Sequence, residues 1–278
     1  MAKFWAKAPE PSPALSAALA NLDRLARQRP ELESAARTLG PVLIAIFLKP
    51  FGPVDTPLLE SIDPDQPLFS RISMSIDLDD LAQRVEAIAL ALRPTTPSAT
   101  AVASQWIMSP TKNSNLARAV ELAIHGRLGE LSENQEHGEL CTTLLRLGLL
   151  PQLGAWTLAI TKARGQTVWN RGECPHCGGP PLLAETRGLE AKRYLRCGLC
   201  AADWPFARLR CPACDSTDHR QLSTKFAEGE GERYKLALCS ACGYQIKVVS
   251  TLDSLAMPSL LVAELATLHL DYLPEIRS

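Results

Sequence analysis

The chain has 278 residues, a formal net charge of −1 and only 5% aromatic residues. This length allows one or two domains with a sizeable core. The near-neutral charge argues against nucleic acid and anionic membranes, the partners that a strongly basic protein attracts.

The N-terminal part of the chain carries helix patterns separated by prolines. Residues 1–13 hold no apolar run suited to a secretory signal, so we expect a protein of the reducing cytosol. Ser12 followed by Pro13 predicts the start of a first helix, and Pro30 opens a second one. The apolar stretches Pro41–Leu48 and Leu147–Ile160 are too short, or too broken by proline and glycine, to predict a membrane span.

Further start signals continue the helical pattern. Asp77 predicts the N-cap of a third helix, and a fourth is expected over residues 98–108. Ser109 predicts the start of a fifth helix, Ser132 the cap of a sixth, and Pro151 the start of a short seventh helix ending near residue 164. We therefore expect an all-α bundle over residues 1–165.

Beyond residue 165 the pattern changes to short segments with β propensity, followed by one last helix. The last helix is indicated by leucines between Leu260 and Leu270. The predicted strands are Thr167–Trp169, Tyr194–Arg196, Phe206–Leu209, Tyr234–Leu238 and Tyr244–Ser250.

Eight of the nine cysteines form four C-x-x-C pairs in this region. Two residues between cysteines form a tight turn that directs both sulfurs to one ion, and two such turns complete a tetrahedron. The connections 178–196 and 215–238 are long enough for a hairpin that returns to the same ion, and 201–210 is a shorter spacer, which favours two sites in sequential order. The predicted ligands are Cys174, Cys177, Cys197 and Cys200 at site 1, and Cys211, Cys214, Cys239 and Cys242 at site 2.

Two questions stay open at the level of the cysteine pattern. A cross-braced arrangement, with the first and third pairs on one ion, is an alternative to the sequential one. Four thiolates accept zinc or iron, so the ligands do not identify the metal. Because a closed four-thiolate site leaves no position for a substrate, we expect a structural role, with a redox role as the alternative. Gly178 and Gly243 follow the second cysteine of a pair, where a positive φ brings backbone N–H groups near the sulfurs, whereas Ala201 and Asp215 do not match a strict rubredoxin pattern.

Other chemistry-bearing residues give weaker signals. Cys141 is expected to be a buried core thiol. His137 lies four residues earlier and could form a metal-binding pair with it, but the sequence supplies no further ligands for such a site. His176 is expected to face solvent. A basic run of Lys192, Arg193, Arg196, Arg208 and Arg210 is either a surface for an acidic partner or ordinary solvated charge. No catalytic triad, phosphate-binding loop or H-E-x-x-H motif is present, so we expect no enzymatic activity.

Four stretches of the cysteine region resemble the formate dehydrogenase accessory protein FdhE family. The motifs are Cys174-Pro-His-Cys-Gly-Gly-Pro-Pro181, Arg193-Tyr-Leu-Arg-Cys-Gly-Leu-Cys200 with Trp204, Arg208-Leu-Arg-Cys211, and Cys239-Ser-Ala-Cys-Gly-Tyr-Gln-Ile-Lys247. The resemblance covers the cysteine region and extends to the last helix, while the helical part offers no distinctive motif.

This resemblance implies a cytoplasmic protein that is needed for active respiratory formate dehydrogenase, a molybdenum or tungsten enzyme. It implies binding to the catalytic subunit during maturation, and rubredoxin-like cysteine turns that favour iron over zinc. The expected fold is α+β: an N-terminal all-α bundle, two tandem four-cysteine rubredoxin-like or zinc-ribbon modules, and a C-terminal helix. The expected domains are residues 1–165, 166–205, 206–252 and 253–278 for these four parts.

Two other functions fit zinc-ribbon-like segments. A nucleic-acid-binding protein is disfavoured because residues 171–250 hold 12 Lys and Arg against 9 Asp and Glu, a net charge of only +3, with no aromatic-basic stripe. A rubredoxin-type electron carrier is the other alternative, and an iron-loaded protein would be red. The sequence does not indicate an oligomeric state.

Overall fold

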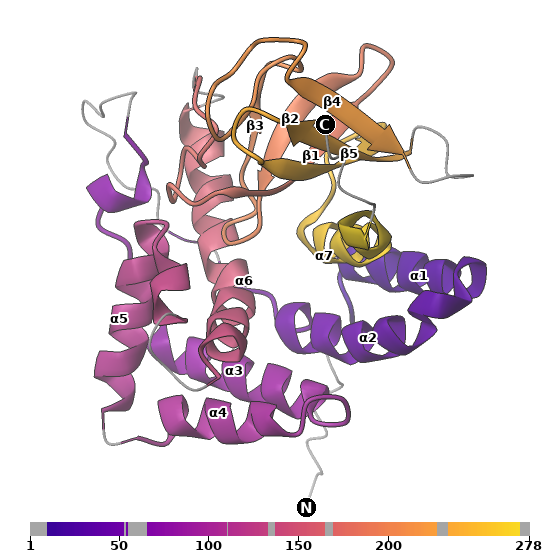
Figure 1. The fold of residues 1–278 in the computed structure, drawn as a ribbon. Helices are drawn as coiled ribbons and strands as arrows, with labels where there is room; N and C mark the ends of the chain where they lie inside the picture. The colour runs from indigo at the N-terminus through magenta and orange to yellow at the C-terminus, as the bar shows by residue number, and fades with distance from the viewer. Residues whose placement is uncertain are drawn as a thin grey trace, which may run out of the picture.

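The structure, a computed structural model, describes residues 10–52, 54, 66–109, 111–132, 137–164, 169–226 and 233–272. Helices form the N-terminal part and a sheet lies at one end of them (Figure 1). The α-helices are α1 (Pro13–Gln28), α2 (Glu33–Phe47), α3 (Leu78–Leu92), α4 (Ser98–Ile107), α5 (Lys112–Ile124), α6 (Gly138–Arg164) and α7 (Met257–Ala266). Short 3-10 turns are η1 (Pro30–Leu32), η2 (Phe69–Arg71), η3 (Leu128–Leu131) and η4 (Leu268–Tyr272).

Two predicted helix starts are confirmed by their caps. The Ser12 hydroxyl accepts a hydrogen bond from the Leu15 N–H at 3.2 Å, and Pro13 stands at the first helical position. The Asp77 carboxylate accepts from the N–H groups of Asp79 and Asp80 at 3.0 and 2.9 Å. Each cap satisfies backbone donors that have no partner within the helix, which is why these positions are readable from sequence.

The predicted sixth and seventh helices are one continuous helix, α6, so two start signals were misread. Ser132 closes the turn η3 and its hydroxyl donates to the Gly129 carbonyl at 2.6 Å; residues 133–136 lie outside the described residues. Pro151 lies inside α6 instead of opening a helix. Proline inside a helix removes one hydrogen bond. Complete burial of Leu149, Leu150 and Leu153 offsets that cost.

Helix α6 is also longer than the apolar stretch that the sequence suggested. Over Gly138–Ala163 it is long and apolar enough to cross a membrane by length and composition alone, and no second helix of this kind occurs among the residues described. However, 72% of its apolar window is buried inside the protein. The central helix of a core passes the same test, and α6 occupies that central position (Figure 1).

Six strands form one mixed sheet in the order β3-β2-β1-β6-β5-β4. Their bounds are β1 (Pro181–Arg187), β2 (Lys192–Cys197), β3 (Asp203–Pro205), β4 (Leu222–Phe226), β5 (Tyr234–Cys239) and β6 (Gln245–Thr251). All neighbours are antiparallel except β1 and β6, which are parallel with Ala184 opposite Val248. Through this pair, the strands of the two cysteine modules share a single sheet.

The predicted strands at Tyr194–Arg196, Tyr234–Leu238 and Tyr244–Ser250 are confirmed, with shifted ends. Phe206–Leu209 forms no strand, and of Thr167–Trp169 only Trp169 is described, outside any strand. Strands β1, β3 and β4 were missed. The fold class itself is confirmed: helices, then a mixed sheet with two four-cysteine groups, then a helix. The four domain boundaries stay a prediction.

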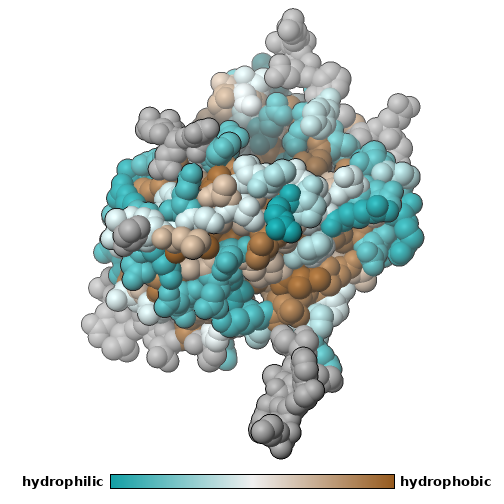
Figure 2. Space-filling model, turned by 90° about the horizontal axis from the view of Figure 1, so that it is seen from below, coloured by the Kyte–Doolittle hydropathy of each residue, from teal (hydrophilic) through white to brown (hydrophobic). Residues whose placement is uncertain are grey.

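Helix α7 lies between the helices and the sheet. Its residues Leu261 and Leu265 belong to the main core, whereas Leu260 packs with Leu183 and Val249 of the sheet. Figure 1 shows α7 beside α1 and α2, under the sheet. Figure 2 shows the helical part from below, on the side away from the sheet. Apolar residues lie among polar ones on this face, as on most protein surfaces.

A buried ion pair joins α2, α3 and α6. Asp80 and Arg84 are 5% and 4% exposed, and the Arg84 Nε lies 2.7 Å from the Asp80 carboxylate. The Arg84 guanidinium also donates to the carbonyls of Ile46 and Lys49, and the Gln152 amide of α6 donates to Asp80 at 3.2 Å. Burial alone would raise the pKa of Asp80, but the hydrogen bonds and charge of Arg84 lower it below its ordinary value.

We therefore expect Asp80→Asn to reduce the free energy of unfolding by about 3 kcal/mol at pH 7, because it leaves Arg84 buried without an anion. A depressed pKa stabilises the fold above the pKa of the unfolded carboxyl, about 4, and this contribution is lost as the pH falls through the lower folded value. The gap between wild type and variant in urea unfolding should thus shrink below about pH 4. Asp79→Asn is the control, because the Asp79 side chain is 78% exposed; equal losses for both variants would contradict the prediction.

Candidate metal centres

All four C-x-x-C turns share one backbone hydrogen bond. The N–H of the first cysteine donates to the carbonyl five residues later, in the pairs Cys174–Gly179, Cys197–Ala202, Cys211–Ser216 and Cys239–Tyr244, at 2.8–2.9 Å. In three of the turns the N–H two residues after the first cysteine also lies 3.4 Å from its sulfur. N–H groups directed at sulfur favour the thiolate, the form that binds metal.

The residue after the second cysteine has a positive φ in every turn. Gly178 and Gly243 have φ of 75°, and Ala201 and Asp215 adopt 56° and 60°. The departure of Ala201 and Asp215 from glycine therefore leaves the backbone geometry unchanged. Asp215 tolerates this region and pairs with Arg210 at 2.9 Å, while the Ala201 carbonyl accepts from Arg196 at 3.3 Å.

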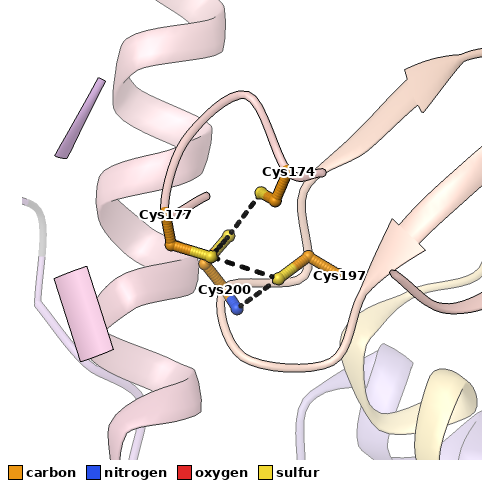
Figure 3. Close-up of side chains that lie close together, drawn as sticks. All are labelled: Cys174, Cys177, Cys197 and Cys200. Atoms are coloured by element: carbon orange, nitrogen blue, oxygen red, sulfur yellow. Dashed lines mark hydrogen bonds between the residues drawn. The ribbon is translucent and has the colours of Figure 1, made fainter. Parts of the chain in front are cut away.

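The thiols of site 1 converge in the interior. Cys174, Cys177, Cys197 and Cys200 are at most 1% exposed. Sulfur–sulfur distances are 3.6 Å for Cys174–Cys200 and 3.5 Å for Cys177–Cys197, and Figure 3 shows the two turns facing each other beside a helix. Burial raises the pKa of the Cys174 thiol well above its ordinary value.

The thiols of site 2 converge at the surface. The Cys211–Cys242 sulfurs are 3.6 Å apart and the Cys214–Cys239 sulfurs 3.7 Å apart. Cys211 and Cys239 are buried, whereas Cys214 and Cys242 are exposed. A hydrogen bond from the Ser216 N–H lowers the pKa of Cys214 from its ordinary value.

The two groups follow the sequential arrangement and not the cross-braced one. Within each group all four sulfurs lie within 4.8 Å of one another. A tetrahedral zinc–thiolate site with bonds of about 2.3 Å has sulfur–sulfur distances of about 3.8 Å, against about 2.05 Å in a disulfide. The described residues therefore hold two four-thiol groups with the spacing that a tetrahedral ion requires, without distinguishing zinc from iron.

A buried arginine beside site 2 favours a negatively charged group at that site. Arg193 is 8% exposed, yet its Nε and Nη2 atoms have no hydrogen-bond partner among the described residues. Its Nη1 lies 3.3 Å from the carbonyl of Arg210, the residue before Cys211, and burial lowers its pKa. A buried cation without an anion is costly. A metal–thiolate group at Cys211 would carry net negative charge and would supply such an anion.

The helices hold site 1 in place. The N–H groups of Leu68 and Phe69 donate to the carbonyls of Pro175 and His176 at 3.0 and 2.8 Å. A Cβ on Gly126 would lie 2.6 Å from the backbone of Gly178. On the second turn, Arg146 of α6 donates to the Gly198 carbonyl at 3.2 Å. Site 1 is thus part of the interface between the helices and the sheet.

His176 is correspondingly buried, not solvent-facing as the sequence suggested. It is 7% exposed and its ring meets Phe69 edge-to-face at 5.6 Å. Cys141 is buried, as expected, and burial raises its pKa to about 12. No four-ligand group includes His137 or Cys141 in the part of the chain that is described.

Most residues of the predicted basic run are not exposed at the surface. Arg196 is 3% exposed and pairs with Glu185, which is fully buried and also accepts from Arg187 at 2.6 Å. Arg196 further donates to the Leu255 carbonyl at 2.9 Å, so this network ties β2 to the segment leading into α7. With Arg193 also buried, only Lys192 and Arg208 of the run are exposed. Sequence reasoning missed Glu185 because β1 itself was not predicted.

A cavity of about 600 Å³ opens next to site 1. It is lined by residues of α2, α6 and the start of α7 together with Cys200 and Arg196. A Cβ on Gly154 would lie 2.5 Å from Met257 Cε and 3.8 Å from the Cys200 carbonyl, so this glycine allows three parts of the fold to meet there.

Comparisons with known proteins agree with this architecture. Residues 173–208, which contain the whole of site 1, match the family model described as "FdhE, central domain". The chain is 34% identical over 136 residues to an FdhE homolog of Stutzerimonas stutzeri, a match that covers 45% of this chain and 44% of that protein. It is 31% identical over 107 residues to an FdhE homolog of Aquifex aeolicus, covering 37% of each chain.

The matched stretches span less than half the length of these curated relatives. The crystal structure of the FdhE protein from Pseudomonas aeruginosa superposes with a TM-score of 0.66 at 21% identity, over 93% of this chain and 90% of that one. The superposition extends the likeness of fold to the helical part. The resemblance to the FdhE family is therefore confirmed: residues 173–208 match the FdhE central-domain model, and the chain has the same fold as an FdhE protein.

Proposed function

We propose that this chain is an accessory protein for the maturation of a respiratory formate dehydrogenase, and that it binds the catalytic subunit of that enzyme in the cytoplasm. The observation that carries the proposal is the pair of four-thiol groups in a chain that has the fold of an FdhE protein, with site 1 inside the stretch that matches the FdhE central domain. The chain acts by binding and carries out no reaction of its own.

The eight cysteines are proposed to hold two metal ions. One ion is bound at site 1 by Cys174, Cys177, Cys197 and Cys200, and the other at site 2 by Cys211, Cys214, Cys239 and Cys242. Thiolate distances and N–H groups directed at sulfur support both zinc and iron. Bound metal makes the turns rigid and fixes the sheet against the helices. The family resemblance favours iron.

One alternative keeps a specific supporting observation. The backbone pattern shared by all four turns, with an N–H group near the first sulfur in three of them, also suits an iron site that carries an electron. Anaerobic purification separates the alternatives. An electron carrier would contain iron and, once oxidised, would show a red colour that disappears on reduction, whereas a zinc protein stays colourless.

The test of the proposed role is complementation in the source organism. We expect deletion of the gene to abolish formate dehydrogenase activity in cell extracts, and expression of the wild type or of Cys141→Ser to restore it. Cys197→Ser/Cys200→Ser should fail to restore activity, and a tagged wild-type chain should capture the catalytic subunit. Full activity in the deletion strain, or capture of no formate dehydrogenase subunit, would end the proposal.

A further inference from the structure

The two four-thiol groups differ in access from outside. The site 1 sulfur-bearing residues are all buried, whereas at site 2 Cys214 and Cys242 are exposed and Cys211 and Cys239 are buried. An incoming ligand can displace a thiolate only if it can approach the ion. At site 1 all four cysteines are at most 1% exposed, although Cys200 borders the cavity beside α6. Site 2 offers an open approach on the side of its two exposed cysteines.

Opening site 1 would require separating the helices from the sheet. Its first turn is bound by Leu68 and Phe69, and its second turn is bound by Arg146. A Cβ on Gly126 would reach within 2.6 Å of the backbone after Cys177, which shows how closely the two parts pack. Loss of the site 1 ion is thus coupled to loss of this interface.

Site 2 lies on the outer part of the sheet, where fewer elements constrain it. Its turns flank β4 and β5, and β4 is the edge strand in Figure 1. Residues 213–215 and 240–243 of the two turns are exposed. By contrast, Cys211 and Cys239 are 1% and 3% exposed and line one pocket together with Arg193. One half of the site is fixed and the other is open.

We propose that site 2 is a metal-exchange site, at which an external thiolate or other soft donor enters the coordination sphere, while site 1 retains its ion. This inference rests on the proposed occupancy of both groups by metal. A bond from the metal to the incoming sulfur forms as the bond to Cys214 or Cys242 breaks. The released thiolate takes the proton that the incoming thiol loses, and the oxidation state of the metal does not change. Cys211 and Cys239 hold the ion throughout the exchange.

The first experiment uses the full-length wild-type protein carrying two zinc ions per chain. A chromogenic chelator, 4-(2-pyridylazo)resorcinol, reports the released zinc in the presence and absence of glutathione. We expect two phases of equal amplitude, with glutathione accelerating only the first. Release in a single phase, or equal acceleration of both phases, would overturn the proposal.

Pulsed alkylation with N-ethylmaleimide assigns the phases without any substitution. Mass spectrometry should find the first labels at Cys214 and Cys242 during the fast phase, and labels at Cys174, Cys177, Cys197 and Cys200 only during the slow phase. First labelling at a site 1 cysteine would contradict the assignment. As a second check, Cys242→Ser should speed the first phase and leave the slow phase unchanged.

This result is separable from the proposed role in formate dehydrogenase maturation. Biphasic release from a chain that fails to complement would leave the exchange site standing and refute the role. Complementation by a chain that loses both ions together would support the role in maturation and refute the exchange site. A purified chain that binds no metal would refute the exchange site as well as the metal assignment.

Discussion

Replacing Cys197 and Cys200 by serine is expected to remove the metal of site 1 and to destabilise the junction between the sheet and the helices. The free energy of binding at a structural four-thiolate zinc site is about 10 kcal/mol or more, comparable with the whole stability of a domain. At site 1 this energy holds together the sheet and the helices, through Phe69 on the first turn and Arg146 on the second. Metal analysis should find one ion per chain in place of two, and urea unfolding should begin at a much lower concentration.

The tryptophans near site 1 give the optical signal for this measurement. Trp169 donates to the Glu173 carbonyl at 2.7 Å and Trp204 to the Arg171 carbonyl at 3.1 Å, both close to the first turn. Their fluorescence should shift toward that of exposed indole in the site 1 variant.

The matched variant is Cys214→Ser/Cys242→Ser, which also removes two thiols from one site. It should lose one ion as well, yet keep the wild-type tryptophan fluorescence, because no backbone hydrogen bond joins the exposed half of site 2 to a helix in the described part of the chain. Cys141→Ser controls for the loss of a buried thiol outside both sites. Equal losses of stability in the two double variants would show that site 1 is not the junction between the sheet and the helices.

The metal-binding groups were predictable because their chemistry is local. Two cysteines separated by two residues form the same turn in many folds, and the lengths of the connections between the pairs decided the grouping. The positive φ of Ala201 and Asp215 was less predictable, because glycine is the usual signal for it. In this protein the geometry of the ligands determines the backbone at those two positions.

The single sheet could not be predicted, because its central pairing is not local. Strand β1 pairs in parallel with β6, the last strand of the chain, with Ala184 opposite Val248, and no turn signal specifies such a pair. The buried network of Glu185 and Arg196 follows from that pairing. A charged residue in a short β segment resembles a surface residue until its strand is placed in the middle of a sheet.

The misreading of Pro151 has a similar origin. A proline after an apolar run is the usual sign of a helix start, and the local pattern gave no reason to prefer an uninterrupted helix. What keeps α6 continuous is the surrounding core, including Leu149 and Leu153, which are fully buried. Tertiary burial thus overrides local preference at this residue.

Gly172→Ala is expected to be the most damaging single methyl addition on the sheet side of the molecule. A Cβ at position 172 would lie 1.7 Å from the carbonyl oxygen of Pro212 and 2.5 Å from its carbonyl carbon. Both atoms belong to backbone, so no side-chain rotation relieves the contact. Pro212 follows Cys211, so the segment before site 1 must move away from the first turn of site 2. We expect a loss of about 3 kcal/mol or more in urea unfolding, together with faster release of the site 2 metal to a chelator.

Two glycines serve as controls for this substitution. Gly129 has no atom within 4 Å of an added Cβ and an ordinary φ, so Gly129→Ala should change stability by less than about 0.5 kcal/mol. Gly243 also has open space but a φ of +75°, so Gly243→Ala measures backbone strain alone, about 1 kcal/mol. The steric explanation requires Gly172→Ala to exceed both. If Gly172→Ala unfolds at the same urea concentration as Gly129→Ala, the inference that the two sites pack closely against each other is wrong. A loss that only equals that of Gly243→Ala would point to backbone strain in place of the contact with Pro212.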